Sequence, residues 1–306
     1  SLASTKITQD QTLFKLLHYK EYRSDVVSNI SNFMFSGISE WSKYAPELTI
    51  ILCQVVSSMP NARKSAFDAL KAMFAELLTR AGSEYSNIMD EFISSQFSKD
   101  NKNENYESLV KLADTMIPLI NEELKGDKSS QEYRYLIRTL AYLLQLVLRS
   151  YNLKPNEENR KNINFIFNQL NDIMNETNKQ PTSSMNDEEK AKLKNYNSCV
   201  LANQRLLLQH FSMLADIIKD CLPPKDASII IYNFISSIRK DNQTIDKSKM
   251  QLLLSLSIKG IWNIESGGQL QTLLSKEINK AFKDKNCSGF INEIITEIGR
   301  ASCRER

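Results

Sequence analysis

The residues best suited to bind a metal ion are two cysteines and a histidine that recur at a constant interval. Cys199, His210 and Cys221 are each eleven residues apart within one predicted helix. Eleven residues make almost three turns, so the side chains would share a face, but each interval also rises about 16 Å. Two ligands of one zinc ion lie only about 4 Å apart. We therefore predict no metal site and expect these residues to fill a helix interface.

Histidine-dependent catalysis has two candidate centres, because His18 and His210 are the only histidines. Neither lies near a G-x-S-x-G elbow or an evident partner. The glycines form no G-x-x-x-x-G-K-[ST] or G-x-G-x-x-G motif, so a phosphate cradle of the known kinds is not predicted. We assign no catalytic and no cofactor-binding residue, expect no cofactor, and predict that the chain is not an enzyme.

Adjacent carboxylates could act as an acid and a base, but their positions favour another role. The pairs are Glu122 with Glu123 and Glu157 with Glu158. Both pairs fall at predicted helix ends, where capping and interaction with the helix dipole explain acidic residues. No acid–base pair is therefore assigned.

The charge balance argues against a nucleic-acid partner. The formal net charge is +3, and the last nine residues, IGRASCRER (298–306), contribute +2 of it. This segment resembles the translation of a common sequencing adapter, so we expect it to be a non-native tail and the corrected charge to be +1. Lys190, Lys192 and Lys194 alternate beside Asp187–Glu189, which is typical of a solvated helix face.

Three arginines are the only candidate site residues. Arg134, Arg138 and Arg149 lie on the polar ribbon of the most apolar segment, residues 133–153. We expect inter-helix ion pairs or hydrogen bonds to carbonyl groups, and the alternative is a partner-binding patch.

That apolar segment predicts a helix around which the chain is organised. Its apolar residues recur at steps of three and four, as on one broad stripe of a helix, and further apolar residues widen the stripe. A helix that is apolar over most of its circumference belongs between other helices.

The same periodicity predicts helices along the whole chain. Their ranges are 11–20, 24–44, 46–58, 62–80, 83–98, 105–124 with a kink at Pro118, 133–153, 155–175, 187–221, one from Pro224, 246–262, 269–283 and one from Ser288. A strand competes with the helix at 228–232, where β-branched residues cluster. Residues 176–188 are polar, and we expect them to be a disordered or protease-sensitive loop.

These elements predict an all-α fold. The chain has 306 residues, longer than most single compact cores, and its helices are joined by short links. We therefore predict an armadillo- or HEAT-like α-solenoid of about thirteen antiparallel helices over residues 1–297. The adapter-like end and the initial serine lead us to expect a fragment of a longer chain.

The cysteines and the apolar runs bear on localisation. Cys53, Cys199, Cys221 and Cys287 are widely spaced, without a CxxC pair, as expected for reduced thiols. No apolar run reaches the roughly 18 residues that a membrane span needs. We expect a cytoplasmic protein with no membrane span.

As an ordered series, residues 47–297 resemble the armadillo-like helical region of the DOCK (dedicator of cytokinesis) family. The most similar stretch is LIRTLAYLLQLVLRSYNL (136–153), with an R-T-L near its start and an R-S pair near its end. Similar in order and spacing are LTIILCQVVSSM (48–59), YSNIMDEFISSQF (85–97), LLLQHFSMLADIIKDCL (206–222), KMQLLLSLSIKGIW (249–262) and LQTLLSKEINKAF (270–282).

This resemblance implies a non-catalytic scaffold. In that family the helical region lies between a lipid-binding C2-like module and the module that releases nucleotide from Rac or Cdc42. A Rho-family GTPase and an ELMO-type regulator are therefore implied as partners of the parent protein only, with membrane recruitment through its other modules. The alternative is a free-standing α-solenoid adaptor, such as a transport receptor or trafficking subunit, that binds a peptide or protein.

Overall fold

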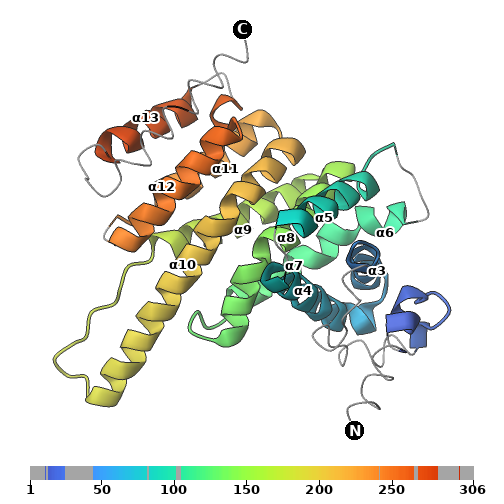
Figure 1. The fold of residues 1–306 in the computed structure, drawn as a ribbon. Coiled ribbons are helices and arrows are strands. Elements are labelled where there is room, and N and C mark those ends of the chain that lie inside the picture. The colour runs from blue at the N-terminus through green and yellow to red at the C-terminus, as the bar shows by residue number, and fades with distance from the viewer. Residues whose placement is uncertain are drawn as a thin grey trace. The chain divides into compact units, whose positions relative to one another are not determined.

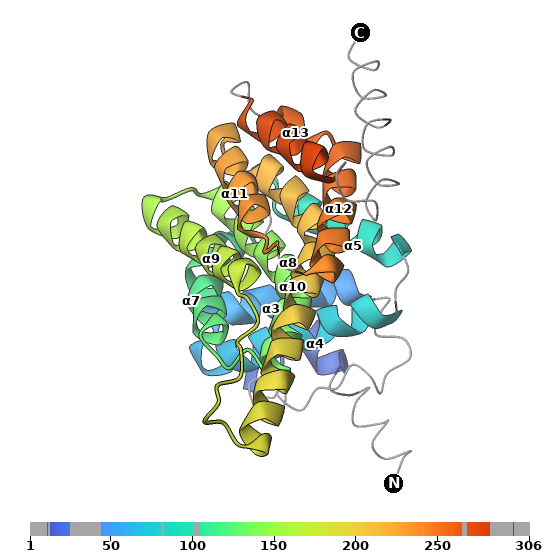
Figure 2. The same cartoon turned by 90° about the vertical axis from the view of Figure 1, so that its left-hand side faces the viewer.

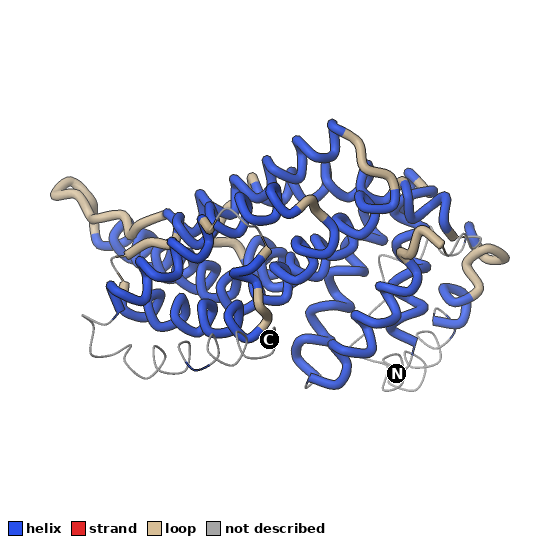
Figure 3. The backbone as a smooth tube through the Cα atoms, turned by 90° about the horizontal axis from the view of Figure 1, so that it is seen from above, coloured by secondary structure: helices blue, strands red, loops and turns tan. Residues whose placement is uncertain are grey.

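The computed structural model describes residues 11, 13–24, 44–80, 83–100, 105–240, 242–264, 268–281 and 296. Within these ranges every regular element is a helix and no strand occurs (Figures 1 and 3). The predicted all-α class is confirmed. Nearly all of the predicted helix 24–44, the last predicted helix except for residue 296, and the adapter-like tail lie outside the described residues.

The chain divides into two compact units. Unit 1 comprises Ser1–Glu123 and Tyr142–Arg160, and unit 2 comprises Leu124–Ala141 and Lys161–Arg306. The first boundary falls at the last residue of α7 (Leu112–Leu124). The other two fall inside α8 (Gln131–Leu153) and α9 (Glu157–Asn175), so these two helices contribute residues to both units. A single array over residues 1–297 stays a prediction.

Unit 1 is a set of helices packed around α3. Its elements are α3 (Ala45–Ser58), the 3-10 turn η4 (Pro60–Ala62), α4 (Arg63–Arg80), α5 (Ser83–Gln96), α6 (Tyr106–Val110), α7 (Leu112–Leu124), the second half of α8 and the start of α9. Helix α3 packs against α4, α5 and α6. Pro46 stands in the first turn of α3, as predicted, where its missing N–H would have had no intrahelical partner.

The predicted helix 105–124 is two helices, and the break is not at the proline. Helix α7 continues through Pro118, whereas the chain leaves the helix at Lys111. The cause is the hydroxyl of Ser150, which accepts from Ala113 N at 2.9 Å and donates to Leu109 O at 2.6 Å. In a continuous helix these two backbone groups would bond to each other. A side chain inserted into the ladder therefore separates α6 from α7.

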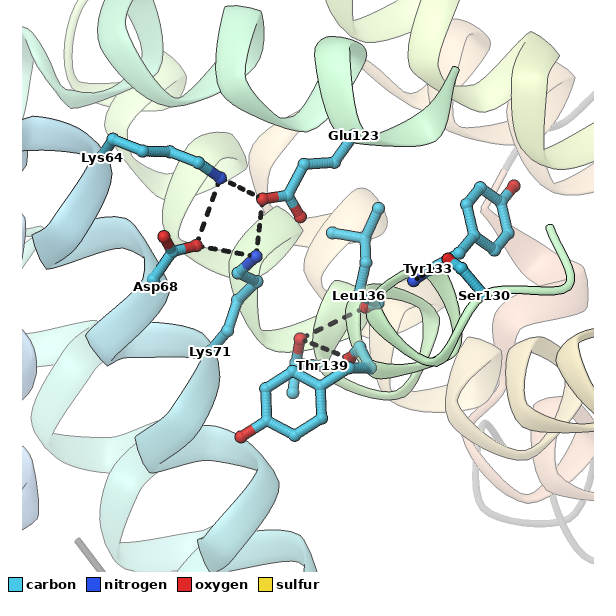
Figure 4. Close-up of polar contacts among 9 residues, drawn as sticks. Lys64, Asp68, Lys71, Glu123, Ser130, Tyr133, Leu136 and Thr139 are labelled. Carbon is cyan, nitrogen blue, oxygen red and sulfur yellow. Dashed lines mark hydrogen bonds and ion pairs between the residues drawn. The ribbon is translucent and has the colours of Figure 1, made fainter. Parts of the chain in front are cut away.

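Helix α8 is buried on every side along part of its length. All residues from 139 to 148 are buried. The helix begins where the Tyr133 N–H donates to Ser130 Oγ at 3.0 Å, and Thr139 donates its hydroxyl to the Tyr135 carbonyl at 3.1 Å (Figure 4). Burying Thr139 therefore leaves no orphaned hydroxyl. The prediction that this apolar helix is enclosed is confirmed.

A cluster of charges holds α4 against the end of α7. The Glu123 carboxylate forms ion pairs with the ammonium groups of Lys64 and Lys71, the latter at 2.5 Å. The Asp68 carboxylate pairs with the same two lysines, at 3.2 Å from Lys64 and 2.9 Å from Lys71 (Figure 4). A carboxylate is unfavourable beside a helix C-terminus, because the carbonyl groups there carry negative partial charge. The two lysines offset that repulsion.

Unit 2 is built around the longest helix. Its elements are the first half of α8, most of α9, α10 (Asp187–Cys221), α11 (Pro224–Ser237), α12 (Gln243–Ile258), the 3-10 turn η5 (Ile261–Asn263) and α13 (Gln269–Ala281). Helix α10 packs against α11 and α12, and α11 packs against α13. Because residues 228–232 are helical, the competing strand interpretation is wrong.

The predicted helix 246–262 ends earlier, at Ile258. Gly260 has φ 64°, a left-handed conformation that glycine adopts without strain, and it turns the chain out of α12. Ile261 and Trp262, which belong to η5, are buried, and the indole N–H of Trp262 donates to Ser257 Oγ at 2.8 Å.

Some apolar residues within the predicted helices are exposed. They are Phe14, Phe165, Ile229 and Ile258, with exposed fractions of 52%, 49%, 41% and 63%. Each stands within two residues of buried neighbours on its helix. Successive helical residues point about 100° apart, so a long apolar run cannot place every member on one face.

The complete burial of Leu144 generates a stability prediction. Leu144→Ala should lower the unfolding free energy by about 2–5 kcal/mol, through lost transfer energy and the cavity left behind. Lys192→Ala is the control, since that side chain is 74% exposed, and it should stay within about 0.5 kcal/mol. Thermal melting followed by circular dichroism measures both, and equal melting temperatures would contradict the role of α8 as the packed centre.

The inserted hydroxyl of Ser150 generates a second prediction. Ser150→Ala should destabilise the protein by about 1–3 kcal/mol, because a buried N–H and a buried carbonyl lose their shared partner. Ser198→Ala is the matched control, as its exposed hydroxyl only donates to the Lys194 carbonyl of its own helix. If urea denaturation gave Ser150→Ala the stability of the unchanged protein, α6 and α7 would be able to close into one ladder without the hydroxyl.

Candidate functional site

The three arginines of α8 do not converge on one point. Arg134 is exposed, whereas Arg138 and Arg149 are half-buried. Arg134 and Arg138 are one turn apart in unit 2, but Arg149 belongs to unit 1 and lies about 16 Å further along the helix. The ion pairs and the partner-binding patch considered for these residues both stay predictions.

The polar ribbon on which these arginines lie becomes more buried along the helix. Gln145 is fully buried and donates to the Asp90 carboxylate at 3.1 Å. Arg149 has a buried Nε without a hydrogen-bond partner among the described residues. The second half of the ribbon is therefore part of the interior of unit 1, where it reaches a carboxylate on α5.

Arg138 lies close enough to α10 to affect a histidine. Burial, and then the positive charge of Arg138, hold the pKa of His210 below its usual value. His210 is therefore neutral at physiological pH. The pair places a cation next to a half-buried imidazole in unit 2, and no acid or base chemistry follows from it.

The eleven-residue series lies on α10, as predicted. Cys199 is half-buried and donates to the Ser129 carbonyl at 3.7 Å, and Cys221 is buried. Because α10 is an unbroken helix, neighbouring members of the series are separated by about 16 Å along its axis. In the part of the chain that the structure describes, no three metal-ligating side chains come together.

The carboxylate pairs occupy helix ends, as predicted. Glu122 and Glu123 are in the last turn of α7, and Glu157 and Glu158 are in the first turn of α9. Glu123 is held by its two lysines, and Glu157 lies 3.7 Å from Arg160.

A polar cluster in unit 2 encloses Glu176, the residue that follows α9. Its carboxylate accepts from Lys128 Nζ at 2.6 Å and from the Tyr196 hydroxyl at 2.7 Å. Burial opposes the charged form, but these hydrogen bonds and the lysine charge outweigh it and lower the pKa of Glu176. Burial and the bond to Glu176 raise the pKa of Tyr196 to about 12.

The end of α9 is closed by side chains and backbone from later helices. Gln204, fully buried on α10, donates to the carbonyl groups of Ile173 and Glu176 at 2.8 Å each. The Arg239 N–H donates to the Met174 carbonyl at 3.1 Å. The last carbonyl groups of a helix have no intrahelical donors. The cluster therefore serves first as a helix cap.

The polar segment 176–186 runs back along the first turns of α10 (Figures 1 and 2). Asn197 of α10 pairs with the backbone of Lys179: its amide donates to the carbonyl at 2.9 Å and its oxygen accepts the N–H at 3.0 Å. Arg239 donates to Asn178 Oδ1 at 3.0 Å. These contacts fix the path of the segment, while the predicted protease sensitivity stays a prediction.

A groove of about 370 Å³ lies between this segment and α10. Its lining residues are Asn178, Lys179, Gln180, Pro181, Lys190, Leu193, Lys194, Asn197, Ser198 and Leu201. Sequence reasoning treated the lysines as a solvated face and missed the groove. The spacing of the α10 residues could have marked one face, but nothing in the sequence showed that the loop would lie beside it.

No family model and no curated protein matches this chain. Among the described residues, no helix combines the length and the hydropathy that crossing a bilayer requires.

The charge of Glu176 generates a prediction of pH dependence. Glu176→Gln keeps the shape but loses the charge, so it should cost about 1–2 kcal/mol at neutral pH. A lowered folded-state pKa stabilises the protein above the ordinary glutamate pKa of 4.5, and that stabilisation is lost as the pH falls through the lowered value. The deficit of the variant should therefore shrink on acidification below pH 4.5.

Urea denaturation across a pH series measures this deficit. Glu91→Gln, a change at an exposed carboxylate of α5, is the control and should show no comparable deficit at neutral pH. A deficit for Glu176→Gln that stayed constant down to acidic pH would mean that the charge of Glu176 does not stabilise the fold.

Proposed function

We propose that this chain is a non-catalytic α-solenoid segment, of the armadillo or HEAT kind, from a DOCK-family guanine nucleotide exchange factor for Rho-family GTPases of the Rac or Cdc42 type. It acts as a cytoplasmic scaffold in small-GTPase signalling and cytoskeletal regulation. Its own partners are proteins. The GTPase and an ELMO-type regulator are partners of the parent protein.

The helix contacts of unit 2 support a solenoid. Helix α10 packs against α11 and also against α12, and α11 packs against α13. Helices α10 and α11 thus each contact the helix that stands two places later in the chain. Stacked helix pairs make contacts of this kind, since every pair covers the apolar face of the next.

The positions of the similar stretches support the family. All six fall mainly on helices, namely α3, α5, α8, α10, α12 and α13. The hydroxyl-bearing members of the R-T-L and R-S patterns, Thr139 and Ser150, are both fully buried. Ser150 joins Leu109 and Ala113 across the break between α6 and α7, and this is the observation that carries the proposal. A serine that forms such a joint has a structural reason to recur in a family pattern.

The competing function is a free-standing adaptor that binds a peptide or protein. The two functions differ in what flanks the segment in the complete transcript. A C2-like module upstream and an exchange module downstream would support the exchange factor. A reading frame that contains only further helical repeats would support the adaptor.

An exchange assay tests the proposed division of labour. The purified segment should leave release of labelled GDP from Rac and Cdc42 at the background rate, because the module that performs exchange is a separate one. The full-length protein should accelerate release from at least one of the two GTPases. Acceleration by the segment alone would contradict the non-catalytic role, and an inactive full-length protein would contradict the exchange-factor assignment.

A further inference from the structure

The groove beside α10 uses a helix face, and no other helix of the described residues contributes to its lining. Its α10 residues stand at positions 190, 193, 194, 197, 198 and 201, which is the spacing of a single stripe. In this stripe Leu193 and Leu201 are half-buried, and the first buried residue of α10 is Val200. Of the described residues that line the groove, those from outside α10 all belong to the short segment 178–181.

The groove is a fixed feature of unit 2, because hydrogen bonds hold the segment 178–181, which forms its second wall. The Asn197 side chain holds the Lys179 backbone through two hydrogen bonds, and Arg239 holds Asn178. The ammonium of Lys179 also lies 4.2 Å from the centre of the Tyr196 ring. These contacts fix the segment at its start, while the capping box of Asn186 and Glu189 fixes its junction with α10. Both ends of the segment that forms this wall are therefore held by hydrogen bonds.

The groove has one sign of charge. Of its ten lining residues, three are lysines and none is acidic. Lys190 has only a weak partner, since Asp187 lies 3.7 Å away and is fully exposed. Leu193, Leu201 and Pro181 supply an apolar floor between the cations. A complementary ligand therefore carries an aliphatic side chain flanked by carboxylates.

We propose that this groove docks an acidic, leucine-containing peptide segment of a protein partner. The segment binds as an extended chain, because the lining follows α10 from residue 190 to residue 201 along one side of the groove. Its carboxylates pair with Lys190 and Lys194, and its leucine covers Leu193 and Leu201. The proposal rests on unit 2 alone and holds for a scaffold segment and for an adaptor alike.

The charges around the groove favour a peptide over a membrane. Asp187, Glu188 and Glu189 form the first turn of α10, immediately before Lys190. A flat anionic bilayer that approached the lysines would also meet these carboxylates, and their repulsion opposes binding. A narrow peptide seated between α10 and the segment 178–181 avoids most of it.

The test uses the full chain and a fluorescein-labelled peptide of repeated Asp-Glu-Leu. Fluorescence anisotropy at low salt should show saturable binding that weakens as salt is added. The double variant Lys190→Glu with Lys194→Glu should weaken binding by about tenfold, because two attractive pairs become repulsive. The control is Lys192→Glu, which makes the same kind of charge reversal at one position of the same helix, outside the groove, and it should change affinity by less than about twofold.

Two further probes separate specific docking from other association. A peptide with alanine in place of leucine should bind at least about threefold more weakly, since it loses the apolar contact. Circular dichroism checks that the double variant keeps its helix content. Absence of saturable peptide binding, equal losses in the double variant and Lys192→Glu, or lysine-dependent binding to phosphatidylserine vesicles without peptide binding would each overturn the proposal.

Discussion

The enclosure of α8 from residue 139 to 148 is the constraint on which much of the structure depends. An enclosed helix needs partners for its polar groups inside the protein, because an unpaired buried group costs about 1–3 kcal/mol. Three buried side chains of α8 find partners in three ways, although Gln145 Oε1 has none among the described residues. Thr139 bonds within its own helix, Gln145 reaches the carboxylate of Asp90, and Ser150 enters the hydrogen-bond ladder between α6 and α7. The last of these contacts also decides where one helix ends and another begins.

The same requirement shapes unit 2, although the groups to be satisfied there are at the end of a helix. Gln204 supplies donors to the last carbonyl groups of α9. The charged carboxylate of Glu176, just beyond them, accepts hydrogen bonds from Lys128 and Tyr196. The segment that follows is then held by Asn197 along the early turns of α10. A polar stretch without apolar anchors thus gains a definite path from hydrogen bonds, and the lysine-lined groove is a result of that path.

Among the described residues, several charged side chains form ion pairs that join one helix to another. Glu123 joins α4 to α7 through two lysines, and the buried pair of Lys249 and Glu277, at 2.7 Å, joins α12 to α13. Such pairs specify which helices meet more than they add stability, because burying each charge has a desolvation cost. Lys190 and Lys194 of the groove differ, since they line a hollow, and the pair of Lys190 with the exposed Asp187, at 3.7 Å, lies within the first turns of α10 and joins no two helices. This contrast is why the groove, and not the arginines of α8, is the stronger candidate for binding a partner.

The sequence by itself determined the helices, because each is specified by the spacing of its own apolar residues and by local signals such as Pro46 and the Pro223–Pro224 pair. The enclosure of α8 followed from its composition in the same way. Tertiary structure alone decided the break at Lys111, which depends on Ser150 from a helix 40 residues later in the chain. It also decided which members of apolar runs, such as Phe165 and Ile229, face solvent. The groove could not be predicted from the sequence for the same reason. It forms because Asn197 holds the loop beside one face of α10, and no local sequence pattern specifies that contact.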